Sequence, residues 1–131
     1  MNMLIRACMA KIHRATVTEA NLDYVGSITI DQDLLDASGI QPFQYLIITN
    51  LRNGILWQTY AMAGKRGNGD ICLNGPPAHH FKKGDKVIIL AEAYLKPDEM
   101  KDLNTTVVFV DEKNRVTEVK KHSAIEPKTK A

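Results

Sequence analysis

The order of apolar and polar residues along the chain predicts a domain built mainly from short β-strands. Runs rich in β-branched and aromatic residues recur, and turn-forming residues bound most of them. Strands are expected at residues 4–18, 24–30, 45–49, 55–62, 70–73, 86–95, 105–110 and 116–119. This spacing favours a closed or sandwiched β domain.

Turn residues separate these expected strands. The turn sequences are Asn53-Gly54, Gly67-Asn68-Gly69, Asn74-Gly75-Pro76-Pro77, Pro97-Asp98 and Glu112-Lys113-Asn114. Glycine and asparagine tolerate a positive φ, and proline fixes φ at a value that turns use. Because none of these breaks is long enough to link two domains, we expect a single domain over residues 1–131, ending in a flexible tail at 122–131.

One segment is predicted to be helical. Residues 33–38 follow Asp31, which can cap the first turn, and precede Gly39, which can end the last one. A second, shorter helical turn is expected near residues 77–81.

Composition and charge narrow the class of protein. The chain has 131 residues, 44% of them hydrophobic, which is enough for one buried core. Its 17 basic and 15 acidic residues give a net charge of +2, so there is no electrostatic case for a nucleic-acid partner. The first residues lack the sustained apolar core expected of a signal peptide, and no apolar run approaches membrane-spanning length. Cys8 and Cys72 lie far apart, so reduced thiols in a soluble cytoplasmic protein are expected, without membrane contact.

The histidines do not predict a metal site. His79 and His80 are adjacent, and His13 and His122 lack cysteine or carboxylate neighbours at ligand spacing. Lys11 and His13 are two residues apart in an expected strand, so they share one face. That pair is either solvated surface or half of a polar site.

The sequence DYVGSITID at residues 23–31 contains a Gly-Ser bond within an expected strand. Glycine inside a strand usually marks a bulge or a close backbone approach. Ser27 lies in no GxSxG sequence, so a hydrolase triad has no support. The other interpretation is self-cleavage, in which the Ser27 hydroxyl attacks the carbonyl of Gly26, because glycine has no Cβ to obstruct the approach. The residues alone leave both interpretations open.

A set of short motifs in order resembles the pyruvoyl-dependent aspartate 1-decarboxylases. The resemblance runs from about residue 4 to residue 95 and weakens over the last third of the chain. It rests on Lys11-Ile12-His13-Arg14, Asp23-Tyr24-Val25-Gly26-Ser27, residues 30–40, Asn53-Gly54, Thr59-Tyr60-Ala61 and Asn74-Gly75.

The resemblance implies a mainly β fold, a double-psi β-barrel with one or two short helices, assembled as a homotetramer. It also implies autocatalytic cleavage between Gly26 and Ser27, which gives a β chain of residues 1–26 and an α chain of residues 27–131. The α chain would begin with a pyruvoyl group derived from Ser27, which takes the place of pyridoxal phosphate and needs no metal. The sequence leaves open whether a maturation factor assists the cleavage.

The family reaction converts L-aspartate to β-alanine and CO2, on the route to pantothenate and coenzyme A. By resemblance, Thr59 positions the carbonyl at the cleavage point and Tyr60 returns a proton to the decarboxylated substrate. Lys11 with His13 brings positive charge to a substrate carboxylate, in a site shared between subunits. The implied substrate-binding positions are Lys11, His13, Tyr24, Leu56, Thr59, Asn74, Gly75, Pro76 and Pro77.

Leu56 departs from the family pattern, which has an arginine two residues after Asn53-Gly54. Leucine cannot form the bidentate pair that a guanidinium makes with a carboxylate. One explanation is that the substrate is a less polar α-amino acid, and another is that Leu56 faces the core and leaves the pocket unchanged. Aspartate would otherwise need a different cation, for which the candidates are Lys11, Arg52 and Arg66.

The sequence also leaves two functions open as alternatives to a decarboxylase. One is a non-catalytic β-barrel binding module, for which Leu56 would be a sign of lost chemistry. The other is an N-terminal-serine hydrolase, which would undergo the same cleavage but retain the amine of Ser27.

Overall fold

The computed structural model describes residues 2–23 and 27–125, and within them nine strands and three helical segments form. The expected strands all appear among the described residues, most with ends shifted by a few residues, and residues 24–26 of the expected strand 24–30 lie outside the described part. One strand of three residues, with no alternating pattern to reveal it, was not expected. The bounds are β1 (Ile5–Thr16), β2 (Glu19–Asn21), β3 (Ser27–Asp31), α1 (Gln32–Ser38), β4 (Tyr45–Asn50), β5 (Leu56–Gly64), β6 (Ile71–Asn74), η1 (Pro76–His79), β7 (Lys86–Leu95), η2 (Pro97–Asp102), β8 (Asn104–Val110) and β9 (Val116–Ser123).

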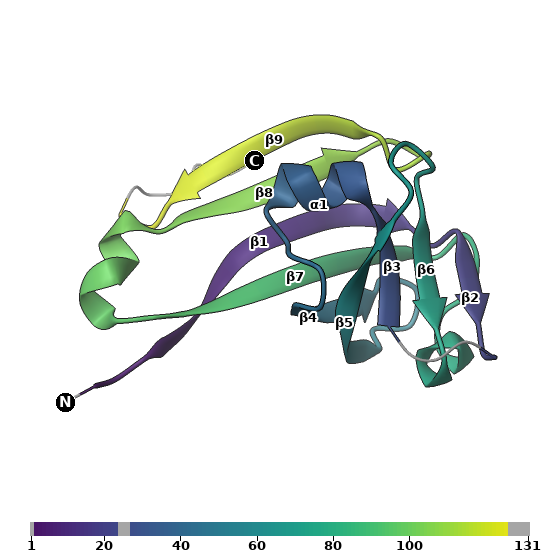
Figure 1. The fold of residues 1–131 in the computed structure, drawn as a ribbon, viewed down its shortest axis with the longest axis horizontal. Helices are drawn as coiled ribbons and strands as arrows, with labels where there is room; N and C mark the ends of the chain where they lie inside the picture. The colour runs from purple at the N-terminus through teal and green to yellow at the C-terminus, as the bar shows by residue number, and fades with distance from the viewer. Residues whose placement is uncertain (1, 24–26, 126–131) are drawn as a thin grey trace.

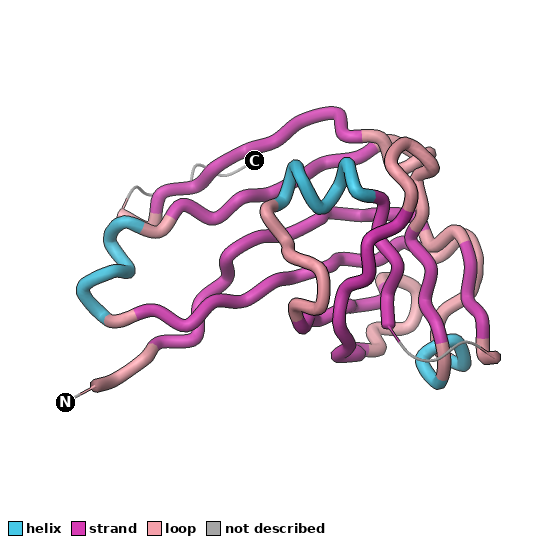
Figure 2. Tube along the Cα trace, in the orientation of Figure 1, coloured by secondary structure: helices cyan, strands magenta, loops and turns pink. Residues whose placement is uncertain are grey.

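The strands form one mixed sheet in the order β2-β6-β3-β5-β4-β7-β1-β8-β9. Three neighbouring pairs are parallel, β1 with β8, β2 with β6 and β3 with β5, and the other pairs are antiparallel. In Figure 1, β1, β7, β8 and β9 run along the length of the molecule, while the shorter strands gather at one end. Figure 2 shows how little of the chain is helical. The expected fold class, a mainly β double-psi β-barrel with short helices, is confirmed.

The core lies between the strands and α1, and it follows the alternation of the sequence. In β1 and β7, buried residues alternate with more exposed ones, as period-2 side-chain direction requires. Helix α1 adds Leu34 and Leu35, both nearly fully buried. The largest side chains of the core are Phe81, Ile12, Ile28, Ile30, Leu34, Leu35, Ile40, Leu46, Ile48, Ile71, Leu73 and Ile89.

Helix α1 begins and ends as predicted. The Asp31 carboxylate accepts a hydrogen bond from the Asp33 N–H at 2.8 Å, and Gly39, at a φ of 80°, donates its N–H to the Leu35 carbonyl at 2.9 Å. Asp31 also accepts from the N–H groups of Gly67 and Gly69, at 3.1 and 2.7 Å. One buried carboxylate therefore holds both the start of the helix and the glycine turn that follows β5.

The other segments agree with the sequence in outline. The expected helical turn after Gly75 is η1, and η2 replaces a simple turn at Pro97-Asp98. Strand β9 runs to Ser123, two residues into the segment 122–131 that was assigned to the tail. Cys8 and Cys72 are both free thiols. Neither α1 nor the two 3₁₀ segments in the described part of the chain could cross a membrane, because they are too short.

Candidate active site

Ser27 is the first residue of β3, the strand that lies between β5 and β6 (Figure 1). It is 4% exposed and pairs with Asn74 across the β3–β6 ladder. In the parallel ladder with β5, Ile28 pairs with Ala61, so the preceding residues Ser27 and Tyr60 lie level with each other. Tyr24 and Gly26, the other expected residues of this segment, lie outside the described residues.

The backbone of Ser27 has an unusual conformation. Its φ is 122°, in the region that residues with a side chain rarely adopt. Such a conformation costs on the order of 1–3 kcal/mol and persists only where the surrounding structure enforces it. The strain is located at the residue that the sequence predicted as the cleavage point.

Asn74 directs a hydrogen-bond donor at Ser27. Its side-chain Nδ2 lies 3.4 Å from Ser27 Oγ and 3.2 Å from Thr29 Oγ1. Asn74 is only 6% exposed, so its amide is shielded from water. An amide nitrogen carries two hydrogens, and both contacts can therefore exist at once.

The segment after Asn74 has few backbone donors to offer. The Gly75 N–H, at a φ of 81°, donates to the Asn21 carbonyl at 2.7 Å, which ties β6 to the end of β2. Pro76 and Pro77 carry no N–H. The Asn74 side chain is therefore the donor that this segment directs at Ser27.

Thr59 and Tyr60 are consecutive in β5 and point to opposite faces. Thr59 is 7% exposed and opposite Leu46, and Tyr60 lies opposite Tyr45. The Tyr60 ring centroid is 6.0 Å from that of Tyr45 and 6.4 Å from that of Phe43. The pairing with Tyr45 could have been found by aligning β4 with β5, but nothing in the sequence places Phe43 beside Tyr60.

Leu56 begins β5 and is 56% exposed. By strand alternation it shares its face with Gln58 and Tyr60, and the buried residues Thr59 and Ala61 lie on the other face. The hypothesis that Leu56 faces the core is therefore wrong. The position holds an apolar side chain at the surface, on the face that carries Tyr60.

Two of the three cations considered as replacements already have partners. Arg52 donates from Nε and Nη2 to the two carboxylate oxygens of Asp85, at 2.8 and 3.1 Å. Arg66 bridges Asp33 and Asp36 at 2.6 and 2.7 Å. Among residues 2–23 and 27–125, Lys11 takes part in no ion pair.

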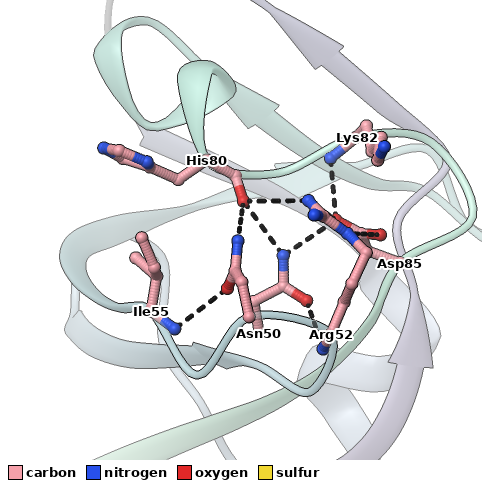
Figure 3. A network of polar contacts seen from close by, with 7 residues as sticks. Asn50, Arg52, Ile55, His80, Lys82 and Asp85 are labelled. Carbon is pink, nitrogen blue, oxygen red and sulfur yellow. Dashed lines mark hydrogen bonds and ion pairs between the residues drawn. The ribbon is translucent and has the colours of Figure 1, made fainter.

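The Arg52–Asp85 pair belongs to a larger polar network, shown in Figure 3. Asp85 also accepts from Asn50 Nδ2 at 2.8 Å and from the Lys82 N–H at 3.0 Å. The hydrogen bond from Arg52, the largest of several contributions, lowers the pKa of Asp85 to about 2. Asn50 Nδ2 donates to the His80 carbonyl at 3.0 Å, so the network joins the turn before β5 to the segment after η1.

Lys11 and His13 lie on β1, which β7, β4 and β5 separate from β3 in the sheet. Both side chains lie on the outer face of β1, because the buried residues Ala10 and Ile12 alternate with them. Partial burial, together with the positive charges of Lys11 and Arg14, lowers the pKa of His13 below its usual 6.5. Lys11 and His13 therefore stand four steps away from Ser27 in the strand order.

The arrangement around Ser27 favours an intramolecular reaction. Among the described residues, neither a histidine nor a carboxylate is hydrogen-bonded to Ser27, so they contain no Ser-His-Asp triad. No group of three or more His, Cys, Asp or Glu residues that could hold a metal ion occurs in this part of the chain. The site provides a strained serine, an amide donor at its hydroxyl, and the phenol of Tyr60 on the neighbouring strand β5.

Comparison with known proteins connects this geometry to a family. The family described as aspartate decarboxylase matches residues 3–117. The aspartate 1-decarboxylase of Ruminiclostridium cellulolyticum is 51% identical over 115 residues, which is 88% of this chain and 90% of that protein. That of Carboxydothermus hydrogenoformans is 52% identical over 118 residues, 90% of this chain and 93% of that protein. That of Leptospira biflexa serovar Patoc is 48% identical over 114 residues, 86% of this chain and 97% of that protein.

Proposed function

This chain belongs to the aspartate decarboxylase family, and from that premise we propose that it decarboxylates an α-amino acid with a pyruvoyl group made from its own Ser27. The observation that carries the proposal is the buried Ser27, held at a φ of 122° with Asn74 Nδ2 3.4 Å from its hydroxyl oxygen. A binding module would have no need of backbone strain at this residue.

The chain's own residues suit the formation of this group. In the proposed first step, Ser27 Oγ attacks the carbonyl carbon of Gly26, and the C–N bond breaks as the hydroxyl proton passes to the nitrogen, which leaves an ester and a free amine. Elimination then removes the Ser27 Cα proton, breaks the Ser27 Cβ–O bond and releases Gly26 as a carboxylate, which leaves dehydroalanine. Uptake of one water and loss of one ammonia convert dehydroalanine to the pyruvoyl group. Asn74 Nδ2, 3.4 Å from Ser27 Oγ, stabilises the negative charge on Oγ as the hydroxyl loses its proton.

Two residues of β5 complete this proposal. Thr59, buried on the strand next to β3, holds the carbonyl at the cleavage point. Once formed from Ser27, the pyruvoyl group would draw electrons away from the substrate bond that breaks to release CO2. Tyr60, level with Ser27, donates its phenolic proton to the substrate carbon that has lost its carboxylate.

We further propose that the site is shared between copies of the chain in a homotetramer. On the outer face of the sheet, Lys11 lies side by side with three residues of neighbouring strands: Ile47, Leu90 and Val107. All four side chains are partly exposed. An outer sheet face with this many apolar side chains suits packing against another copy. Such packing would let Lys11 and His13 of one copy approach Ser27 of another.

Two substrates are supported by different observations. L-aspartate, which would give β-alanine and CO2, is supported by the names of the relatives. A less polar α-amino acid is supported by the exposed Leu56 and by the engagement of Arg52 and Arg66 in ion pairs. Of the three cations considered, Lys11 remains available for a side-chain carboxylate.

The proposed function is tested by CO2 release from a panel of amino acids. The wild-type protein should release CO2 from at least one of them, and Ser27→Ala should release none because it cannot form the pyruvoyl group. A correctly folded wild-type protein that releases no CO2 from any amino acid would support the binding module instead.

A further inference from the structure

We propose that Thr29 is a positioning residue for chain cleavage, because it holds the Asn74 amide in the orientation that directs a hydrogen at Ser27. This inference rests on the proposed self-cleavage at Ser27 and gives a role to a residue that has none in the sequence motifs or in the resemblance. Thr29 is on β3, two residues after Ser27, so both side chains lie on one face of the strand.

The contacts between the three side chains are short and screened from water. Asn74 Nδ2 lies 3.2 Å from Thr29 Oγ1 and 3.4 Å from Ser27 Oγ. Ser27 and Asn74 are buried, and Thr29 is partly buried. The bond to Thr29 is the shorter of the two, so Thr29 is the firmer anchor of the amide.

An asparagine amide needs such an anchor. Its terminal torsion is broad, and rotation by half a turn would replace the Nδ2 donor with the Oδ1 acceptor. An acceptor at that position could not stabilise negative charge on Ser27 Oγ as its hydroxyl loses its proton. When Thr29 Oγ1 accepts one of the two Nδ2 hydrogens, the amide plane is fixed and the second hydrogen is directed at Ser27.

The Thr29 side chain is itself held in place. It is β-branched, so few rotamers are open to it in a strand. Its Cγ2 methyl lies 3.1 Å from the point where a Cβ on Gly64 would be, so this methyl packs closely against β5. With the methyl against β5, the hydroxyl is on the side of Asn74.

A matched pair of variants separates this role from simple packing. Thr29→Val keeps the shape and the methyl but loses the hydroxyl, whereas Thr29→Ser keeps the hydroxyl and loses the methyl. We expect Thr29→Val to cleave roughly tenfold more slowly than the wild type, which corresponds to the loss of one hydrogen bond. Thr29→Ser should cleave within about twofold of the wild-type rate.

The measurement is the fraction of uncleaved chain over time by intact mass, with a thermal melting curve for each variant. If Thr29→Val cleaved at the wild-type rate, or if both variants cleaved equally slowly, the proposal would be overturned. Slowing in Thr29→Val with a melting temperature equal to that of Thr29→Ser would support it, because a packing defect alone would lower both stability and rate.

A second measurement does not depend on cleavage. In Ser27→Ala, which should stay whole, Thr29 is the remaining acceptor for Asn74 Nδ2 in the described structure. Adding Thr29→Val should speed solvent exchange of the Asn74 side-chain amide protons by roughly tenfold. Unchanged exchange would overturn the role of Thr29. A wild-type chain that never cleaves would instead contradict the proposed function, and the exchange measurement would still decide what Thr29 does to Asn74.

Discussion

Leu56 stands at the start of β5 with 56% of its surface exposed, on the strand face that also carries Tyr60. A carboxylate that approached this face would meet a side chain unable to donate a hydrogen bond, so binding it there would cost the desolvation of a charge. The choice between aspartate and a less polar substrate therefore depends on this position and on whether Lys11 of another copy pairs with the carboxylate.

Leu56→Arg is expected to raise kcat/KM for aspartate at least about tenfold and to lower it for less polar amino acids, because it restores a bidentate partner for a carboxylate. The measurement is CO2 release from a panel of amino acids. Leu4→Arg, at another exposed leucine outside the site, serves as the control. If Leu56→Arg turned over aspartate at the wild-type rate, our interpretation of the position would be wrong.

Tyr60→Phe is expected to separate maturation from turnover. The variant keeps the ring that packs beside Tyr45 and Phe43 but loses the phenolic proton. Chain cleavage should proceed as in the wild type, while CO2-releasing turnover should fall by roughly 10²–10⁴-fold, as expected when a general acid is removed. Tyr45→Phe is the matched control and should retain most activity. Comparable activity in Tyr60→Phe and Tyr45→Phe would exclude Tyr60 as the proton donor.

The sequence could predict some of the site residues and not others. The Gly26-Ser27 bond, Thr59-Tyr60 and Asn74 stand in motifs of fixed spacing, so a reader of the sequence can find them. The bond between Asn74 and Thr29 depends on the register of β6 against β3, which no local pattern encodes. Phe43 adopts a φ of 68°, a conformation that a sequence does not predict for phenylalanine.

At the scale of elements, alternation of buried and more exposed residues marks β1, β4, β5 and β7, so the sequence could predict these strands from their period of two. The short strand β2 was not predicted, because three residues are too few to show a periodic pattern. The network around Asp85 was not predicted either, because its residues are far apart in the sequence. Asn50 ends β4, Arg52 is in the turn after it, and Asp85 directly precedes β7. This network ties the turn before β5, the strand that Leu56 begins, to the segment after η1.

Asp85→Asn tests the strength of this network. The folded pKa of about 2 lies below the reference value of 3.8, so the charged carboxylate stabilises the fold above pH 4 and this contribution is lost as the pH falls toward 2. Water screens this ion pair, because the Arg52 side chain is 45% exposed. The charge of Asp85 therefore adds about 1–2 kcal/mol to the free energy of unfolding at pH 7.

Urea unfolding of Asp85→Asn against the wild type should therefore show lower stability at pH 7 and a difference that shrinks between pH 4 and pH 2. Asp102→Asn, at an exposed carboxylate in η2, should show little effect at any pH. A difference for Asp85→Asn that did not depend on pH would mean that the charge of Asp85 contributes nothing.

At the scale of the whole molecule, the sheet order separates the residues that the family resemblance placed in one site. Four steps in that order separate β1, with Lys11 and His13, from β3, with Ser27. Periodicity could predict that Lys11 and His13 share a face, but it could not say what that face contacts. The apolar residues around Lys11 are the observation that favours a second copy.

Complementation between two inactive variants tests the shared site. Lys11→Ala and Ser27→Ala should each be inactive alone, the first because it lacks the cation and the second because it cannot form the pyruvoyl group. Mixed oligomers of the two should recover part of the activity, because some sites combine Lys11 of one copy with the pyruvoyl group of another. Dilution to monomers should abolish wild-type turnover, and full activity in a verified monomer would refute the shared site.

The central claim is that this chain makes its own cofactor at Ser27, and the intact mass of the purified wild-type protein tests it most directly. We predict two chains, residues 1–26 and 27–131, with the larger one lighter by one ammonia than a chain that begins with serine. Ser27→Ala should remain a single chain of 14.6 kDa. A wild-type protein that stays whole at 14.6 kDa, or that cleaves but retains the serine amine, would contradict the account.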